Sequence, residues 1–413
     1  MCRFLLALGI VFVGGTTTVG QTGGVISFLS STLVTNENAG SVVITVQRTG
    51  NTSQAVAVHY TTADHSGSTG VFPCSTVNGT ASSRCDYTSA GGTLIFAAGQ
   101  TSRQFKVLIS QDSYTEGTEN VQVTLSDPNN GAVLGTPSTA TLQISDDPIE
   151  PNFNVIDDTL NFVTQHYHDF LNREPDPDGL QFWANQIFGC GSKASCIEAT
   201  RVHVSAAFFL SIEFQQTGFF VYRLYKVSYG DIQDLPVPLR FNEFLPDAQQ
   251  ISQGVLVGVG NWEAQLEANK VAYLADFVNR SRFLSAYPTS LTPDQFVDML
   301  IENVPRILTL NREALIAEFG GAANSSDTAA RGRVLRAIVD NKAFVQQQFE
   351  PAFVTMQYFG YMRRNPDATP DVNFNGWQFW LDKLNQFNGD FIEAEMVKAF
   401  ISSGEYRARF GSQ

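Results

Sequence analysis

In the N-terminal third, the side chains whose type and grouping could do chemistry are acidic residues beside turns. They are few, and they fall at the ends of predicted strands; the set is Glu37, Asp86, Asp112, Glu116, Glu119, Asp146 and Asp147. Calcium takes about six to eight oxygen ligands from carboxylates and carbonyls, and loops can bend to supply them. Grouped carboxylates could therefore hold this ion. The alternative is that these acids cap turns and keep the surface soluble.

The overall charge of the chain narrows its choice of partners. It carries 40 acidic and 26 basic residues, a formal net charge of -14. Such a chain has no basic face with which to meet a phosphate backbone, so nucleic acid is not an expected partner. Divalent cations are the expected counter-charges.

A second set of oxygen-bearing residues lies in a turn near the C-terminus. Residues 371–376 read Asp-Val-Asn-Phe-Asn-Gly, and Asp382 follows at the twelfth position. This spacing is similar to that of an EF-hand loop, which has glycine at its sixth position. The secondary candidate metal ligands are therefore Asp371, Asn373, Asn375 and Asp382. We favour a simpler interpretation, in which Asp and Asn cap the following helix and Gly supplies a turn with positive φ.

No catalytic motif accompanies these residues in the sequence, and we name no catalytic residue. His166 and His168 are two positions apart, so on one helix they cannot share a metal as histidines at i and i+4 do. His203 has apolar neighbours and is expected in the core. The charge run from Arg331 to Arg336 is expected on the solvated side of a helix.

Alternating apolar residues predict the strands that must position the N-terminal acids. Apolar side chains recur with a period of two in several runs, for example Val42, Ile44, Val46; Phe105, Val107, Ile109; and Val121, Val123, Leu125. Turns rich in Gly, Asn, Ser and Thr separate the runs, and no helical period intervenes. The pattern predicts an immunoglobulin-like antiparallel β-sandwich of about seven strands over residues 24–147.

Motifs throughout this segment give it a family resemblance. They are Asn36-Glu37-Asn38-Ala39-Gly40-Ser41, Cys85-Asp86-Tyr87, Gly92-Thr93-Leu94-Ile95-Phe96, Asp112 with Glu116-Gly117-Thr118-Glu119-Asn120, Leu125-Ser126 and Ile144-Ser145-Asp146-Asp147. Together they resemble a Calx-beta domain, the module of sodium/calcium exchangers and many surface proteins. The resemblance implies that the acids converge at one end of the sandwich and bind calcium, because all of the candidates fall where the family places its ligands. Gln111 and Pro148 replace further acids of the family, which favours one calcium site over a multi-ion cluster.

The periodicity changes beyond the sandwich. Prolines break the strand pattern over residues 148–156, which predicts a linker. From there apolar residues recur at steps of three and four, as in Leu160, Val163 and Tyr167. This period predicts an all-helical domain over residues 157–413.

The helical region repeats one pattern near its two ends. The first occurrence is Arg-Glu-Pro-Asp from residue 173, followed by Gly-Leu-Gln-Phe-Trp from residue 179. The second is Arg-Asn-Pro-Asp from residue 364, followed by Gly-Trp-Gln-Phe-Trp from residue 376. We predict copies at about 162–214 and 353–409, and a degenerate copy at 296–349, which pack on one another with their aromatic residues in the core. The pattern resembles the family of unknown function DUF4214, whose helical fold is similar to phycobilisome linker domains. The resemblance implies a secreted or cell-surface bacterial protein and no known activity.

The N-terminus and the cysteines indicate an oxidising compartment. Residues 1–20 run from charged to apolar to small, which predicts a signal peptide, and no later run could cross a membrane. The remaining cysteines form two close pairs, Cys74-Cys85 and Cys190-Cys196, which favours two local disulfides. A zinc site is the competing interpretation, although the pairs are far apart and lack spaced histidines.

These patterns predict a secreted or cell-surface protein with a calcium-binding sandwich and a helical interaction domain. It would act without catalysis in adhesion, scaffolding or envelope assembly, on an extracellular protein or polysaccharide, and its copies allow self-association. The alternative is an enzyme or enzyme subunit acting on extracellular polysaccharide. This chemistry needs two carboxyls about 5 to 10 Å apart across a cleft. A cavity lined by Glu174, Asp176 or Asp371 would support it.

Overall fold

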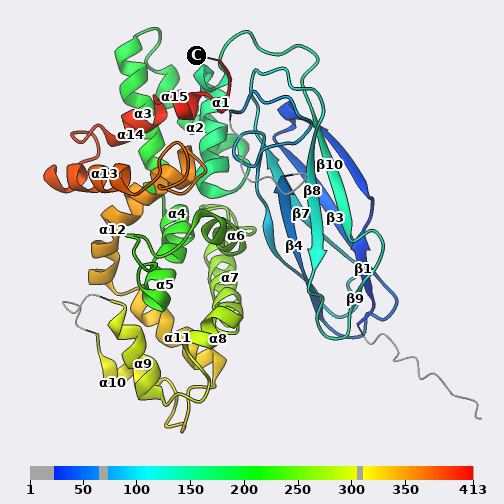
Figure 1. Ribbon diagram of the computed structural model, residues 1–413, viewed down its shortest axis with the longest axis vertical. Helices are drawn as coiled ribbons and strands as arrows, with labels where there is room; N and C mark the ends of the chain where they lie inside the picture. Colours follow the sequence, from blue (N-terminus) through cyan, green and yellow to red (C-terminus); the bar gives the residue numbers. More distant parts are fainter. Residues whose placement is uncertain (1–22, 65–72, 305–309, 413) are drawn as a thin grey trace, which may run out of the picture.

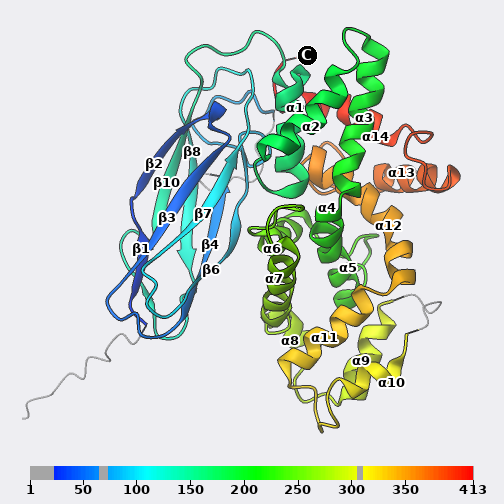
Figure 2. The same ribbon diagram turned by 180° about the vertical axis from the view of Figure 1, so that it is seen from behind.

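The computed structural model describes residues 23–64, 73–304 and 310–412. A β-sandwich and a larger helical region lie side by side (Figure 1 and Figure 2). The predicted organisation, an all-β part followed by an all-α part, is confirmed. The predicted signal peptide at residues 1–20 lies outside the described residues. Within those residues, no helix has the length and apolar character needed to span a bilayer.

Two five-stranded sheets form the sandwich. The first sheet has the order β5 (Tyr87–Thr88), β7 (Ser102–Ile109), β3 (Ser41–Thr49), β1 (Val25–Phe28) and β9 (Val133–Leu134). The second sheet has the order β2 (Thr32–Asn36), β10 (Thr139–Ser145), β8 (Glu119–Ser126), β4 (Val56–Asp64) and β6 (Gly91–Phe96). Val121, Val123 and Leu125 of β8 face the core between the sheets, as their period of two predicts.

The prediction of a wholly antiparallel sandwich is wrong at its outer strands. β1 pairs with β9 in parallel, and β2 pairs with β10 in parallel. The N-terminal segment crosses from the first sheet to the second between Phe28 and Thr32. Each of its two strands therefore lies beside a strand from later in the chain. The described residues contain ten strands rather than about seven, because strands of two to five residues are too short for a period of two to show.

The helical region begins with the 3-10 turn η3 (Val155–Asp157). The first predicted copy contains α1 (Thr159–His166), the π-helix η4 (Tyr167–Leu171), α2 (Pro177–Phe188), α3 (Ala194–Leu210) and α4 (Ile212–Gln216). The middle contains α5 (Gly218–Tyr229), α6 (Phe241–Ser252), α7 (Trp262–Phe277), α8 (Ser281–Ala286), α9 (Pro293–Glu302), α10 (Arg312–Ala317) and α11 (Thr328–Val339). The last copy begins near the end of α12 (Lys342–Met356) and contains the π-helix η5 (Gln357–Tyr361), α13 (Asn375–Gln386), α14 (Met396–Ile401) and α15 (Gly404–Arg407).

The first and last copies have equivalent internal contacts and pack on each other. In the first, Arg173 pairs with Glu213 at 2.7 Å; in the last, Arg364 pairs with Glu405 at 2.5 Å. The two π-helices meet where Gly360 lies against the ring of Phe170. A Cβ atom at position 360 would lie 2.6 Å from Cζ of that ring, so only glycine allows this approach.

Three expectations about individual side chains are wrong. Arg331 is buried. Its guanidinium donates hydrogen bonds to the carbonyl oxygens of Tyr287 and Pro288, which satisfy it inside the protein, and it lies 4.9 Å from the centre of a phenylalanine ring. His203 is exposed, because it shares the outer face of α3 with other exposed residues. Phe182 and Phe379 are exposed, although the aromatic residues of the copies were predicted in the core.

Candidate metal centre

One end of the sandwich gathers the acids that the sequence singled out. Each follows or begins a strand at this end: Glu37 lies on the 3-10 turn η1 (Glu37–Ala39) after β2, Asp86 precedes β5, Asp112 and Glu116 lie between β7 and β8, Glu119 begins β8, and Asp146 and Asp147 follow β10. The acid cluster, defined as Glu37, Asp86, Asp112, Glu116 and Glu119, is buried, with no member more than 5% exposed. The sandwich therefore encloses these carboxylates instead of leaving them in water.

The acid cluster contains two overlapping groups that could hold an ion. Glu37, Asp112 and Glu116 form one group, and the other is Asp86, Glu116 and Glu119. In each group the possible ligand atoms lie within 4.8 Å of one another. Glu116 belongs to both, so the structure offers two adjoining positions where the sequence favoured one.

Asp146 and Asp147 lie outside both groups and position the loops around them. Asp146 Oδ2 accepts hydrogen bonds from the backbone N–H groups of Glu116 at 3.0 Å and Gly117 at 2.9 Å. Asp147 Oδ2 accepts a hydrogen bond from the Gln111 amide at 3.0 Å. These contacts hold the loop that carries Glu116 against the end of β10.

Buried oxygens without a hydrogen-bond donor give the site its chemical character. Among the described residues at this end of the sandwich, the carboxylate oxygens of this kind are Glu37 Oε2, Asp86 Oδ1, Asp112 Oδ2, Glu116 Oε2, Asp146 Oδ1, Asp147 Oδ1 and Glu150 Oε2. A buried carboxylate oxygen is costly unless a donor or a cation satisfies it. Because the available ligands are all oxygens, they fit calcium better than a transition metal that prefers nitrogen or sulfur.

Burial and mutual repulsion keep protons on most of these groups at neutral pH when no cation is bound. Burial, reinforced by repulsion from Asp112, raises the pKa of Glu37 to about 10. Burial and repulsion from Asp86 raise the pKa of Glu116 to about 9 and that of Glu119 to about 11. Burial also raises the pKa of Asp86, to about 6. Cation binding must therefore displace protons, so calcium affinity should increase with pH.

Sequence reasoning missed one acid of this site. Glu150 lies in the segment assigned to the linker, yet its Oε1 accepts a hydrogen bond from the Asp147 N–H at 2.7 Å. Burial raises its pKa, and its charge in turn raises the pKa of Glu37 and Asp112. The sequence did contain a signal for this residue, because Glu150 is an acid only a few residues beyond Asp146. The prolines of this stretch prevent it from forming a helix.

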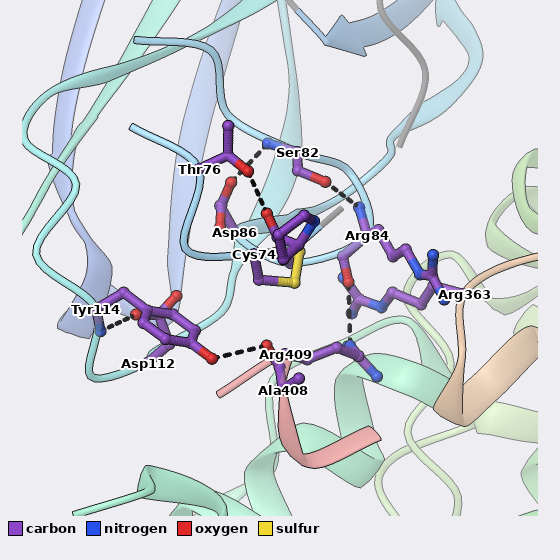
Figure 3. Close-up of a disulfide and its surroundings, with 12 residues drawn as sticks. Cys74, Thr76, Ser82, Arg84, Asp86, Asp112, Tyr114, Arg363, Ala408 and Arg409 are labelled. Carbon is purple, nitrogen blue, oxygen red and sulfur yellow. Dashed lines mark hydrogen bonds between the residues drawn. A yellow bond between two sulfur atoms is a disulfide. The ribbon is translucent and has the colours of Figure 1, made fainter. Parts of the chain in front are cut away.

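The loops of the acid cluster also contact the helical region (Figure 3). Tyr114, two residues after Asp112, donates from its hydroxyl to the Ala408 carbonyl at 3.2 Å. Arg84, two residues before Asp86, pairs with Glu405. Arg409 donates to the Arg84 carbonyl at 3.0 Å. We call this set of contacts the domain seam, and it begins within two residues of two candidate ligands.

A buried ion cluster lies at the centre of the domain seam. The Asp169 carboxylate accepts from Arg363 at 2.9 Å and from Arg409 at 3.1 Å. Arg363 also donates to the Tyr87 carbonyl at 2.9 Å, which joins the sandwich to the cluster. Burial raises the pKa of Asp169, but the guanidinium groups of Arg409 and Arg363 more than offset this and leave the pKa below its ordinary value. Asp169 therefore stays ionised inside the seam.

Both predicted disulfides are present. Cys74 and Cys85 have Cα atoms 5.6 Å apart, and Cys190 and Cys196 have Cα atoms 5.5 Å apart. The first bridge ends directly beside Asp86, so it fixes the loop that carries this candidate ligand and Arg84 (Figure 3).

The secondary candidates near the C-terminus make separate contacts. Asp371 accepts from Arg364 at 2.8 Å, Asp382 accepts from Gln378 at 2.8 Å, and Asn373 accepts from the Asn375 N–H at 2.9 Å. In the described residues neither carboxylate belongs to a group of three acidic, His or Cys ligands. These contacts organise the turn, but the simpler interpretation is wrong in its details. The helix begins at Asn375, so its N-cap residue is Phe374, which makes no side-chain cap hydrogen bond, and Gly376 lies inside the helix without a positive φ.

The buried acid-lined end and the helical partner define a class: a calcium-type β-sandwich module joined to a helical domain. A family model of the Calx-beta domain matches residues 20–72 and 67–148, and a model of the domain of unknown function DUF4214 matches residues 154–218. The N-terminal region is thus a Calx-beta domain, and a DUF4214 domain follows it. Calx-beta domains are calcium-binding β-sandwich domains.

Individual relatives match about a third of this chain or less. Sodium/calcium exchanger 1 of Mus musculus and that of Bos taurus are each 33% identical over 129 residues, covering 27% of this chain. The extracellular matrix organizing protein FRAS1 of Mus musculus is 35% identical over 147 residues, covering 34% of this chain. The chain spans 12% of the length of the exchangers and 3% of that of FRAS1. The solved apo-form Calx CBD1 domain is 27% identical, with a TM-score of 0.25, and the match covers 30% of this chain and 96% of that one.

Proposed function

We propose that this chain is a secreted or cell-surface protein in which a calcium-binding sandwich holds a helical interaction domain in place. It acts in adhesion, scaffolding or envelope assembly, without catalysis. The observation that carries this proposal is the buried acid cluster, whose loops continue directly into the domain seam. The Calx-beta match and the two disulfides support an extracellular, calcium-dependent role.

The residues that would hold calcium are those of the acid cluster. Calcium, when bound, supplies the positive charge that the unpartnered buried oxygens lack. Glu37, Asp112 and Glu116 bind at one position, and Glu116 contributes to the second with Asp86 and Glu119. Asp146 holds the Glu116 backbone in register for both.

Cation binding at this end also acts on the helical region. The Asp112 carboxylate accepts from the Tyr114 N–H at 2.7 Å, and the Tyr114 hydroxyl contacts Ala408. Ordering Asp112 therefore orders the residue that contacts the last copy. The same holds on the other side, where Asp86 and Arg84 share the loop closed by the Cys74-Cys85 bridge.

The structure contains the kind of cavity that the enzyme alternative requires. A cavity of about 480 Å³ between the two domains is lined by Glu174 and Asp176. Both carboxylates are engaged: Asp176 accepts from the Gly179 N–H at 2.8 Å at the start of α2, and Glu174 lies 3.3 Å from His168. Burial raises the pKa of Glu174, but His168 more than offsets this and leaves it below its ordinary value. A general acid needs a raised pKa, so this geometry supports the non-catalytic function.

Hydrogen–deuterium exchange of the full mature chain, with calcium and with chelator, tests the proposal. We expect calcium to slow exchange in the loop from Asp112 to Glu119 and also at residues 405–411 of the helical region. Helix α9, which lies far from the seam, serves as the internal reference. Slower exchange in the sandwich loop alone would show that calcium does not act on the seam, and no change in either segment would reject calcium binding itself.

A further inference from the structure

The Phe-Trp helices α2 and α13 each direct one ring inward and leave the other outside. Trp183 packs 5.7 Å from Phe208, and Trp380 packs 5.7 Å from Phe400. The neighbouring rings, Phe182 and Phe379, are both 56% exposed. The tryptophans are needed for the packing of the copies. This packing does not explain why the phenylalanines point outward.

The two outward rings have matched surroundings. Phe182 meets Trp183 edge to face at 4.9 Å, and Phe379 meets Trp380 in the same way at 5.0 Å. Beside each ring is a hydrogen-bonded pair on the surface: Gln181 to Asn185 at 2.7 Å in the first copy, and Gln378 to Asp382 at 2.8 Å in the last. Each helix therefore presents one aromatic face with an amide and an oxygen acceptor alongside.

Stability does not account for this repetition. The copies have diverged elsewhere, for example in the turn, where Pro177 is absent from the last copy, and at Leu180, which is replaced by a tryptophan. Single exposed apolar residues are common and need no explanation, and most surface substitutions change stability little. Both copies keep the same exposed ring beside a glutamine that donates to a side-chain oxygen, which points to a binding role.

We propose that the outward faces of α2 and α13 bind a neutral polysaccharide, with one sugar ring stacked on Phe182 and another on Phe379. This inference rests on the proposed function and names the partner class of its helical domain. A sugar ring has a face of C–H groups that packs on an aromatic ring, and hydroxyls at its rim that pair with amide donors and oxygen acceptors.

Charge and size favour this occupant over other macromolecules. The net charge of -14 opposes a polyanion and an anionic membrane. Helix α2 has a single charged residue, Asp178, and its exposed face is otherwise made of Pro177, amides and phenylalanines. Helix α13 has one acid and one base, Asp382 and Lys383, whose charges balance. A stable protein interface needs about 800 Å² on each partner, which one ring and its polar pair do not provide. A polymer of repeating sugars offers a stacking ring to each of the two sites.

The test uses the full mature chain and four variants: Phe182→Ser, Phe379→Ser, the double Ser variant and the double Tyr variant. Ile212→Ser is the matched control, because Ile212 is 59% exposed in the first copy but its counterpart in the last copy is Gly404. Binding is measured by retention on cellulose, chitin and curdlan and by affinity electrophoresis in dextran and xyloglucan, with alginate as the anionic reference. All measurements are made with calcium and with chelator, alongside thermal unfolding.

We expect the wild type to bind at least one neutral polysaccharide. Each single Ser variant should bind about tenfold more weakly, and the double Ser variant more weakly than either single variant, because both stacking rings are then absent. The double Tyr variant should bind as the wild type does, since tyrosine keeps an aromatic face.

Three results would overturn the proposal. These are no retention of the wild type on any neutral polysaccharide, Ser variants that bind like Ile212→Ser, and a dimer that disappears in the Ser variants, which would assign the rings to a second copy of the chain. In each case an intact calcium-dependent rise in unfolding temperature would leave the proposed function standing. Absence of that rise would reject the proposed function separately from the sugar-binding inference.

Discussion

In the part of the chain that the structure describes, Glu116 is shared by both carboxylate groups, so its replacement by glutamine should have opposite effects with and without calcium. Glutamine keeps the size of the side chain and removes its charge. Two ionised carboxylates at 4.8 Å repel by about 3.5 kcal/mol at an effective dielectric of 20. Glu116 takes part in two such pairs within each group, so removing its charge relieves the largest repulsion in the cluster.

The pH dependence of this relief has a definite sign. The pKa of Glu116 rises from an ordinary 4.5 to about 9 through burial and repulsion from Asp86. A carboxyl with a raised pKa in the folded state contributes stability below its unfolded pKa, and this contribution is lost as the pH rises through the folded pKa. The calcium-free wild type should therefore become less stable from about pH 4.5 to pH 9, and Glu116→Gln should lose less stability over that window.

Thermal unfolding at pH 6, 7.5 and 9, with calcium and with chelator, measures both effects. For the wild type, calcium at a hundredfold excess over its dissociation constant adds about 2.7 kcal/mol, which corresponds to a rise of roughly 3 °C in Tm for a chain of this length that unfolds as one unit. In Glu116→Gln this rise should vanish, while Tm in chelator at pH 9 should exceed that of the wild type. Glu393→Gln, which removes an exposed acid from the helical region, should change neither value. A chelated variant that is less stable than the wild type at pH 9, or one that keeps the calcium response, would refute the reasoning.

Three further outcomes are expected from the domain seam and the contact between the copies. Asp169→Asn leaves two buried guanidinium groups without their carboxylate and should lower stability by about 3–5 kcal/mol in denaturant unfolding, with or without calcium; an unchanged midpoint would contradict the buried ion cluster. Tyr114→Phe removes the hydrogen bond to Ala408 and should cost about 0.5–1.5 kcal/mol while calcium still binds in calorimetry. Gly360→Ala places a methyl group against the ring of Phe170 and should cost about 1–3 kcal/mol in the same unfolding assay, so full stability would show that the copies do not meet there.

Local periodicity carries most of what the sequence revealed about the fold. Alternation with a period of two located the long strands, and the change to steps of three and four located the helical region. The same reasoning failed where an element was too short, as in β9, or where the chain changed sheets, as between β1 and β2. Sheet switching depends on which strands lie next to each other in space, and local patterns do not contain that information.

The site was partly predictable for a related reason. Strand ends and the Calx-beta resemblance identified the acids that the structure brings together, because ligands at strand ends follow from the fold of the sandwich. Glu150 was missed because its segment has no periodicity. The domain seam could not be predicted, since Arg84 and Glu405 pair across a separation of 321 residues. The burial of Arg331 was not predicted, because the sequence does not show that carbonyl groups elsewhere in the chain will accept its hydrogen bonds.

The domain seam combines two parts that respond differently to conditions. Asp169 and its two arginines keep their charges inside the protein, because the low pKa of Asp169 leaves the carboxylate ionised at neutral pH. The acid cluster instead holds protons at neutral pH and exchanges them for a cation. The ion cluster thus joins the domains under all these conditions, and calcium bound as proposed would add order only to the loops at the edge of the seam. A protein built in this way keeps the helical region attached when calcium is low, and α13, on the side away from the sandwich, stays open to a partner (Figure 1).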